Sequence, residues 1–271
     1  MLKRREDKIP RIMGVVNVTP DSFHAKSRTQ SLEDSIAAAI RMTEEGVDWI
    51  DVGGESTRPG SNPVSIKEEL DRVVPTIEGI RSELPKVCIS IDTRRAEVAR
   101  RSLESGADMV NDVSSLNDPG MLEVIVEHGG PICVMHMKGL PKNMQDDPKY
   151  NDVVNEVKER LSQTTDELME AGVMPEQIVT DPGIGFGKTL EHNLALLSSG
   201  REIVPDDRMG LMWGVSRKSM FRDLLGRESS DDRLAGSLGV AAMSIRKGVD
   251  IMRVHDVAEH LDIFSVMSAL E

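Results

Sequence analysis

The sequence predicts a single (β/α)8 TIM barrel formed by residues 1–271, and three observations support this prediction. Short apolar runs alternate eight times with longer segments, in a chain long enough for eight β–α units. Most of these runs are continuously apolar, which is typical of parallel strands covered on both faces. No stretch rich in Pro, Gly and Ser divides the chain into domains. An open doubly wound sheet remains the alternative, because a sequence does not show whether a sheet closes.

The expected strands are the apolar runs that lead into polar loops. They are Ile12–Val18, Trp49–Gly53, Val87–Asp92, Met109–Val113, Ile132–His136, Ile178–Asp181, Gly210–Ser216 and Ile251–His255. Expected helices include residues 31–46, 65–84, 93–106, 118–130 and 151–172. Ser31 is the candidate N-cap of the first helix, and Pro75 is expected to kink the second. The polar stretch Lys138–Tyr150 is expected to be a loop over the active face.

Composition predicts a cytoplasmic protein with no nucleic-acid or membrane partner. Its 33 basic and 46 acidic residues give a net charge of −13, whereas nucleic-acid binding needs a basic surface. No apolar run approaches the roughly 18 residues that span a bilayer. The first residues are charged and lack the apolar core of a signal peptide. Cys88 and Cys133 lie inside apolar runs and are expected to be buried thiols.

Polar residues gather at the carboxyl ends of the expected strands, where TIM barrels place their catalytic groups. They are Asn17, Arg58, Asp92, Asn111, Asp112, His136, Asp181, Ser216, Arg217, Lys218, Arg253 and His255. A single aspartate at a strand end can merely cap a helix or a turn. A polar group at one end of nearly every strand indicates a binding site instead.

One part of this ring is cationic. Arg58, Lys218, Arg253 and His255 suit a phosphate or pyrophosphate, which arginine binds through its two-pronged guanidinium. The amide oxygen of Asn17 suits a Mg²⁺ ion that stays largely hydrated and bridges to pyrophosphate.

The other part consists of carboxylate and amide groups. Asp92, Asn111 and Asp181 suit a flat heterocycle whose N–H and C=O edges must be paired when they are buried. The ring therefore predicts a ligand that combines a heterocycle with a pyrophosphate.

Nine segments, in order along the chain, resemble dihydropteroate synthases. They are IMGVVNVTPDSF, DVGGESTRPG, ISIDT, NDVSSL, VMHMKGLPKNMQ, DPGIGFGKT, GVSRKSM, RLAGSLG and MRVHDV, which span Ile12 to about Val257. The resemblance implies a TIM barrel and a homodimer formed through helices near the C-terminus. It also implies the family's reaction in folate synthesis, in which 6-hydroxymethyl-7,8-dihydropterin pyrophosphate and p-aminobenzoate give 7,8-dihydropteroate and pyrophosphate. The family is thought to displace the Mg²⁺-bound pyrophosphate by an SN1-like path.

The same resemblance assigns roles to individual residues. Pterin binding falls to Asp92, Asn111, Met135, Asp181, Gly214 and Lys218, of which Asp92, Asp181 and Lys218 are the expected catalytic residues. Pyrophosphate binding falls to Asn17, Arg58, Arg253 and His255, and Asn17 is also the expected Mg²⁺ ligand. Binding of p-aminobenzoate falls to Thr57, Pro59, Phe186 and Ser216.

One segment departs from the family. After TPDSF the family usually has Ser-Asp-Gly-Gly, whereas this chain has His24, Ala25, Lys26 and Ser27. The acidic residue and both glycines are missing from a loop that closes over the substrates in the family. The departure leaves the closure chemistry and the exact arylamine acceptor open.

Two other functions fit parts of the pattern. A methyl-pterin:corrinoid methyltransferase shares the pterin-binding barrel but needs no pyrophosphate site, and a silent paralogue would bind pterin without catalysis. A nucleotide-binding P-loop is disfavoured, because Pro182 stands where DPGIGFGKT would need a glycine. His136 is expected to be a hydrogen-bonded histidine at the barrel mouth rather than a metal ligand.

Overall fold

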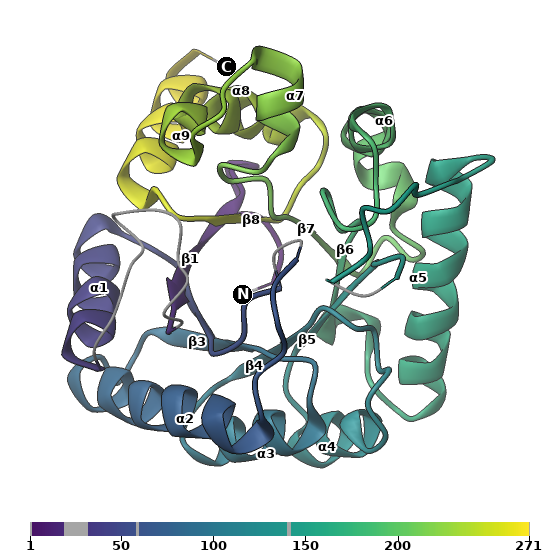
Figure 1. Ribbon diagram of the computed structural model, residues 1–271. Helices are drawn as coiled ribbons and strands as arrows, with labels where there is room; N and C mark the ends of the chain where they lie inside the picture. The colour runs from purple at the N-terminus through teal and green to yellow at the C-terminus, as the bar shows by residue number, and fades with distance from the viewer. Residues whose placement is uncertain (1, 19–31, 58–59, 140–141, 271) are drawn as a thin grey trace.

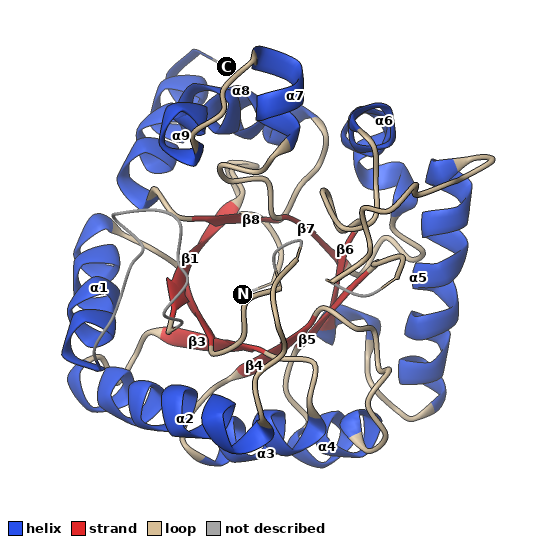
Figure 2. Ribbon diagram, viewed as in Figure 1, coloured by secondary structure: helices blue, strands red, loops and turns tan. Residues whose placement is uncertain are grey.

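The computed structural model closes the strands into one parallel barrel, in the order β1 to β8 (Figure 1). It describes residues 2–18, 32–57, 60–139 and 142–270. Closure excludes the open doubly wound sheet, because β8 pairs with β1 as well as with β7. Helices surround the ring of strands on its outside (Figure 2). The predicted barrel is therefore confirmed.

The strands begin and end close to the predicted positions. They are β1 Arg11–Asn17, β2 Trp49–Gly53, β3 Cys88–Asp92, β4 Met109–Asp112, β5 Ile132–Met135, β6 Ile178–Asp181, β7 Gly210–Trp213 and β8 Ile251–Val254. The prediction for β7 was wrong at its end, since it ran to Ser216. After Trp213 the chain turns, and the Val215 carbonyl accepts a hydrogen bond from the backbone N–H of Lys218 at 3.2 Å. A backbone group used in a turn is lost to the strand ladder.

The helices are α1 Leu32–Glu45, α2 Ile66–Glu83, α3 Ala96–Glu104, α4 Met121–His128, α5 Val153–Glu170, α6 Leu190–Ser199, α7 Met220–Leu225, α8 Leu234–Arg246 and α9 Val257–Leu270. The described residues also form the short 3₁₀ helices η2 Pro175–Gln177, η3 Gly200–Ile203 and η4 Ser230–Arg233. Ser65 caps α2 by accepting from the N–H of Glu68, and α2 continues through Pro75. The candidate cap Ser31 lies outside the described residues. Among the helices described, none is long and apolar enough to cross a membrane.

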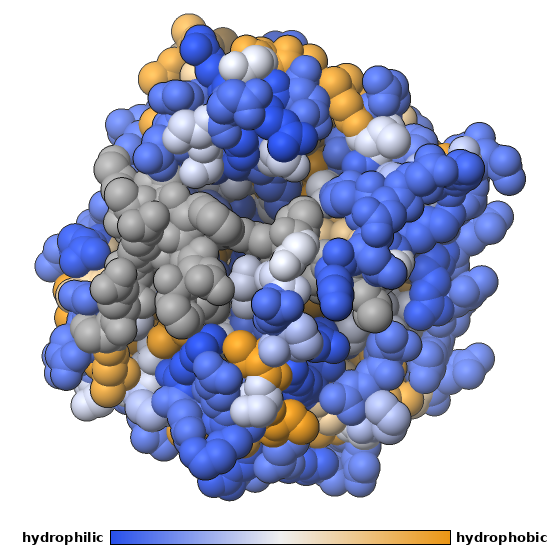
Figure 3. Space-filling model, viewed as in Figure 1, coloured by the Kyte–Doolittle hydropathy of each residue, from blue (hydrophilic) through white to orange (hydrophobic). Residues whose placement is uncertain are grey.

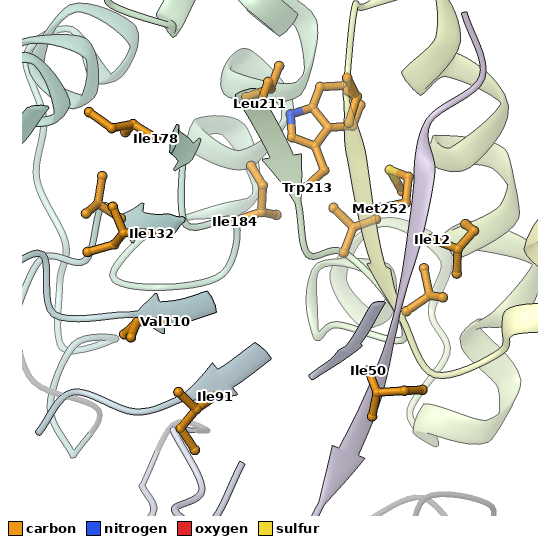
Figure 4. Packing of buried hydrophobic residues seen from close by; sticks show 14 of the residues in the cluster. Ile12, Ile50, Ile91, Val110, Ile132, Ile178, Ile184, Leu211, Trp213 and Met252 are labelled. Carbon is orange, nitrogen blue, oxygen red and sulfur yellow. The ribbon is translucent and has the colours of Figure 1, made fainter. Parts of the chain in front are cut away.

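Alternation along the strands separates two apolar regions, because successive side chains point to opposite faces of a sheet. One set belongs to the main core with the surrounding helices and includes Ile12, Ile50, Ile91, Val110 and Ile132 (Figure 4). The other set fills the barrel interior. It consists of Leu2, Met13, Trp49, Met109, Cys133, Val179, Met212 and Ile251. This interior cluster is an apolar floor below the carboxyl ends of the strands.

Replacing Ile50 with alanine should destabilise the protein by about 2–5 kcal/mol, because the surrounding core closes only partly around a lost side chain. Ile50 is fully buried in the main core. The free energy of unfolding in urea measures the effect, with Val126→Ala as the control. Val126 lies on α4 and is 44% exposed, so its replacement should change stability by no more than about 0.5 kcal/mol. Equal losses in both variants would contradict this account of the core.

Candidate active site

Polar side chains lie directly above the apolar floor. Each of them comes two positions after a floor residue on the same strand. Asp51 follows Trp49, Asn111 follows Met109, and Asp181 follows Val179. Arg253 follows Ile251 in the same way on β8. A step of two residues preserves the face of a strand. The sequence therefore stacks a charged layer on the apolar floor at one end of the barrel.

Arg253 joins two carboxylates within this layer. Its Nε donates to Oδ2 of Asp51 and its Nη2 donates to Oδ2 of Asp92, both at 2.6 Å. Nδ2 of Asn111 donates to the same Asp51 oxygen at 3.3 Å. Oδ1 of Asp51 and Oδ1 of Asn111 are buried and have no hydrogen-bond partner within the described part of the chain. Both oxygens can accept hydrogen bonds from a polar ligand.

Burial controls the ionisation of these groups. It raises the pKa of Asp92 to about 7, although the Arg253 guanidinium opposes the shift. Repulsion from Asp51 raises the pKa of Asp92 further. Burial also disfavours the charged form of Arg253, but Asp51 and Asp92 outweigh this effect and raise its pKa. Asp92 consequently titrates close to neutral pH, where it can exchange protons or hydrogen bonds with a ligand.

Asp181 and Lys218 influence each other electrostatically. Oδ1 of Asp181 accepts a hydrogen bond from the N–H of Gly183 at 2.7 Å. Burial raises the pKa of Asp181, with the Lys218 ammonium and this hydrogen bond opposing the rise. Burial lowers the pKa of Lys218 to about 8, and Asp181 opposes that shift. Both groups are thus held closer to neutrality than in water.

The turn that follows β6 supports the ammonium of Lys218. Nζ of Lys218 donates to the Ile184 carbonyl and lies 4.5 Å from the centroid of the Phe186 ring. A cation over an aromatic face is attracted by the ring quadrupole. Gly183 has φ +67°, and a Cβ there would lie 1.9 Å from the His136 carbonyl oxygen. Only glycine fits this position, which brings the turn against β5.

His136 and Lys188 lie together behind this turn. Nζ of Lys188 lies 3.0 Å from Nδ1 of His136 and donates to the Phe186 carbonyl at 2.9 Å. Burial, reinforced by the Lys188 charge, lowers the pKa of His136 to about 3. His136 is therefore a neutral, hydrogen-bonded residue near the barrel mouth, as predicted. Lys188 interacts with protein groups, the His136 ring and two backbone carbonyls.

Ser216 and His255 meet above β7 and β8. Oγ of Ser216 lies 3.0 Å from Nδ1 of His255 and accepts from the backbone N–H of His255 at 3.2 Å. The two residues follow β7 and β8, whose carboxyl ends are adjacent in the barrel. Their contact brings the two loops together.

These groups surround a cavity of about 540 Å³. The predicted site residues that line it are Asn17, Thr57, Asp92, Phe186, Ser216, Lys218, Arg253 and His255. The face of the molecule around the barrel mouth is largely hydrophilic (Figure 3). The cavity therefore combines cationic groups, a carboxylate that titrates near neutral pH and one aromatic ring.

Four further predicted residues lie outside the lining of this cavity. Asn111, Met135 and Asp181 are buried at the carboxyl ends of β4, β5 and β6. A Cβ on Gly214 would lie 3.7 Å from Oδ2 of Asp181 and 3.9 Å from Cβ of Arg253, so Gly214 borders both side chains. Arg58, Pro59 and the segment from His24 to Ser27 lie outside the described residues.

The family of the chain is shown by its sequence. Residues 13–255 match the family of pterin binding enzymes. Dihydropteroate synthase of Escherichia coli (strain K12) is 45% identical over 260 residues, which cover 96% of this chain and 91% of that protein. The chain belongs to the dihydropteroate synthases, a family of pterin-binding enzymes.

Solved structures of dihydropteroate synthases share this fold. The Xanthomonas albilineans enzyme with 4-aminobenzoic acid has a TM-score of 0.89 and 38% identity, covering 97% of this chain and 94% of that one. The Burkholderia cenocepacia enzyme complexed with 7,8-dihydropteroate has a TM-score of 0.87 and 38% identity, covering 96% of this chain and 91% of that one. The barrel is therefore the shared framework of this chain and these synthases.

Sequence reasoning missed several residues at the mouth of this pterin-binding barrel. Asp51 was read only as part of a strand, yet it holds both Arg253 and Asn111. A charged residue within an apolar run, two positions from Trp49, was the available signal. Met144 and Gln145 from the predicted loop 138–150 also reach the site. Met144 lines the cavity, and Nε2 of Gln145 donates to the Gly185 carbonyl at 2.5 Å.

The loop that carries Thr57 is anchored by Glu55. Its Oε1 accepts from Nε of Arg94 at 2.7 Å, and its Oε2 accepts from Nη2 of Arg95 at 2.8 Å and from the Val64 N–H at 3.0 Å. These bonds tie both ends of the β2–α2 loop to the start of α3. They hold Thr57 at the edge of the cavity.

Replacing Asp51 with asparagine should lower the pKa of Asp92 below about 7, because the repulsion from Asp51 disappears while Arg253 remains. At pH 6–7 the variant should then hold more of Asp92 as carboxylate than the wild type does. A ¹³C NMR titration of the aspartate carboxyl groups measures this pKa. Asp206→Asn, which neutralises a surface carboxylate paired with Arg208, is the control. An unchanged Asp92 titration in Asp51→Asn would refute the coupling.

Proposed function

We propose that the enzyme joins 6-hydroxymethyl-7,8-dihydropterin pyrophosphate to p-aminobenzoate, giving 7,8-dihydropteroate and pyrophosphate, as a dihydropteroate synthase and hence a transferase. The observation that supports this most is the charged layer at the barrel mouth. Arg253 there joins Asp51 and Asp92 beside a cavity that Lys218 and His255 also line. A heterocycle and a pyrophosphate need these two kinds of partner side by side.

The pterin ring is assigned to the carboxylate side of the site, where Asp92 lines the cavity and Asn111 and Asp181 lie buried outside its lining. Asp92 and Asp181 accept its N–H groups, and Asn111 offers an amide edge whose oxygen is free of protein partners among the described residues. Buried N–H and C=O edges of a heterocycle cost free energy unless they are paired. Met135 and Gly214 form apolar and flat parts of the surrounding wall. Lys218 contributes a cation beside Asp181.

The pyrophosphate is assigned to the cationic side. Arg253 uses Nε and Nη2 for Asp51 and Asp92, so its Nη1 is the donor available to an oxyanion. His255 lines the same cavity, and Arg58 of the β2–α2 loop is predicted to join it. These groups neutralise charge that develops on the leaving pyrophosphate, which is the form of stabilisation that lowers such barriers most.

Asn17 is the proposed protein ligand of Mg²⁺. Its amide lies at the end of β1 and lines the cavity. The described residues contain no cluster of three His, Cys, Asp or Glu that could hold a metal by itself. This donor set fits Mg²⁺, which keeps several waters and takes its other ligands from substrate phosphates. When bound, Mg²⁺ neutralises charge on the leaving pyrophosphate.

The chemical step is proposed to be SN1-like. The pterin ring donates electrons to its methylene carbon as the carbon–oxygen bond breaks, and the pyrophosphate leaves with that electron pair. Asp92 and Asp181 stabilise the positive charge left on the pterin, because they are buried where electrostatic interactions are strong. The arylamine nitrogen then forms a bond to this carbon and loses a proton.

The acceptor is assigned to the outer part of the cavity. Thr57, Phe186 and Ser216 line it, with Pro59 predicted from the same loop as Thr57. The Phe186 ring offers a face for the benzene ring of p-aminobenzoate. An arylamine is neutral at pH 7, so its attack needs positioning more than a strong base.

The relatives favour the synthase over a corrinoid methyltransferase, which requires no pyrophosphate site. Conversion of the pterin substrate by the purified protein would exclude a silent paralogue. The protein is also proposed to act in the cytoplasm, where buried thiols such as Cys133 stay reduced.

The purified enzyme with both substrates and Mg²⁺ should produce dihydropteroate and pyrophosphate. Lys218→Met and Arg253→Met should each lose roughly 10²–10³-fold in kcat, because they remove charge that stabilises the transition state. Mass spectrometry of dihydropteroate and a coupled pyrophosphate assay measure the reaction. Omitting Mg²⁺ should abolish it.

The control is Arg208→Met, which removes an exposed arginine paired with Asp206. This variant should keep wild-type turnover. Pyrophosphate release without dihydropteroate would show that the acceptor is wrong. Absence of both products in the wild type would refute the proposed function.

The enzyme is further proposed to form a homodimer through α8 and α9. Large apolar side chains on these helices are exposed, namely Met243 (46%), Val266 (57%) and Leu270 (78%). Apolar surface gathers at the edge of the molecule where the two helices lie (Figure 3). Clustered apolar surface of this kind is typical of protein interfaces.

Val266→Glu should convert the dimer to a monomer, because a charge buried at an apolar interface lacks a partner. Light scattering coupled to size-exclusion chromatography measures the mass in solution. The control is Val126→Glu, which places the same charge at an exposed position on α4 and should leave the dimer intact. A monomeric wild type would exclude the dimer.

A further inference from the structure

A buried ion pair lies beside the cavity, between the loops that follow β7 and β8. Nε and Nη2 of Arg217 donate to the two carboxylate oxygens of Asp256, at 2.8 and 2.7 Å. Only 6% of the Arg217 side chain and 2% of the Asp256 side chain are exposed. A planar guanidinium that meets a carboxylate through two parallel hydrogen bonds fixes orientation as well as distance.

The remaining bonds of Arg217 leave it little freedom. Nη1 donates to the carbonyls of Ser230 and Asp231 at 3.1 and 3.0 Å. Its backbone N–H donates to Oγ of Ser237 at 2.8 Å, and its backbone φ is +56°. A non-glycine residue in this region of φ is strained and persists only where its surroundings hold it. The ion pair is therefore part of what keeps the β7 loop in this shape.

The neighbours of the ion pair are residues of the proposed site. Ser216 and Lys218 flank Arg217 in sequence, and His255 directly precedes Asp256. Ser216 also contacts His255, as described above. The pair that joins Arg217 to Asp256 therefore ties the backbone next to Lys218 to the backbone next to His255.

We propose that Arg217 and Asp256 form a clamp that positions Lys218 and Ser216 against His255 for catalysis, so that Arg217 is a positioning residue. The clamp acts on the proposed synthase site and in that sense rests on the proposed function. Lysine cannot replace Arg217, because an ammonium cannot form two parallel bonds to one carboxylate while also binding two carbonyls. Misplacement of reacting groups by about 1 Å can cost roughly 10²-fold in rate.

The same strand offers a matched control at its other end. Asp250 precedes β8 as Asp256 follows it, and its Oδ2 accepts from Nη1 of Arg201 at 2.5 Å. Arg201 also donates to backbone carbonyls, including those of Gly248 and Asp207. The Arg201–Asp250 pair thus resembles the clamp in chemistry but lies at the amino end of β8, away from the cavity.

The test compares Arg217→Lys, Asp256→Asn and the double variant with Arg201→Lys. For each, thermal unfolding measures stability, steady-state kinetics separates kcat from KM for both substrates, and hydrogen exchange follows residues 214–219 and 254–257. Arg217→Lys should lower kcat at least roughly tenfold while the protein stays folded. Arg201→Lys should lose stability to a similar degree and keep kcat within about twofold.

A coupled pair also predicts non-additivity. The double variant should lose little more kcat than Arg217→Lys alone, because either change already breaks the clamp. Wild-type kcat in folded Arg217→Lys, or equal losses in Arg201→Lys, would overturn the proposal.

Failure of the proposed function would be recognised separately. If the wild type makes no dihydropteroate, hydrogen exchange alone decides on the clamp. Faster exchange in both loops of Arg217→Lys, with Arg201→Lys unchanged there, would support it, and unchanged exchange would overturn it.

Discussion

The Arg253 guanidinium between Asp51 and Asp92 is the interaction on which the barrel mouth depends. Two carboxylates this deeply buried would repel each other without the cation. Arg253 keeps Asp51 available to hold Asn111, and it holds the pKa of Asp92 down to about 7 against the effect of burial. Removing this one charge would disturb groups on β2, β3, β4 and β8 together.

This charged layer is possible because of what lies beneath it. The apolar floor, which includes Leu2 and Ile251, keeps water away from the barrel side of the charged layer. Charges above such a floor interact more strongly than charges in water, but they must be paired to be stable. Two oxygens of this layer, one on Asp51 and one on Asn111, have no hydrogen-bond partner among the described residues. The layer is therefore stable as a fold and still able to pair with a polar ligand.

The sequence predicts much of this from two regularities. Parallel strands bring their carboxyl ends to one face, so Asp92, Asp181 and His255 were expected to lie together. The bounds of β2 and β6 were predicted to the residue, because polar or glycine-rich loops follow directly. The end of β7 was not predicted correctly. Val215 continues the apolar run that predicts a strand, but its carbonyl is used in a turn. Side-chain pairings such as Arg217 with Asp256, 39 positions apart, leave no periodic signal.

Arg253 shows what sequence reasoning leaves out. The resemblance assigns it to pyrophosphate, yet in the protein two of its three nitrogens bind the carboxylate side. The guanidinium therefore lies where the two proposed subsites meet. In the free enzyme it is the main cationic partner of Asp92, and in the proposed reaction a pterin cation would become a second one. As that cation forms, it takes over part of the electrostatic interaction with Asp92. The Arg253 charge then interacts more strongly with the departing pyrophosphate. One shared charge thus links the breaking of the bond to the stabilisation of both its products.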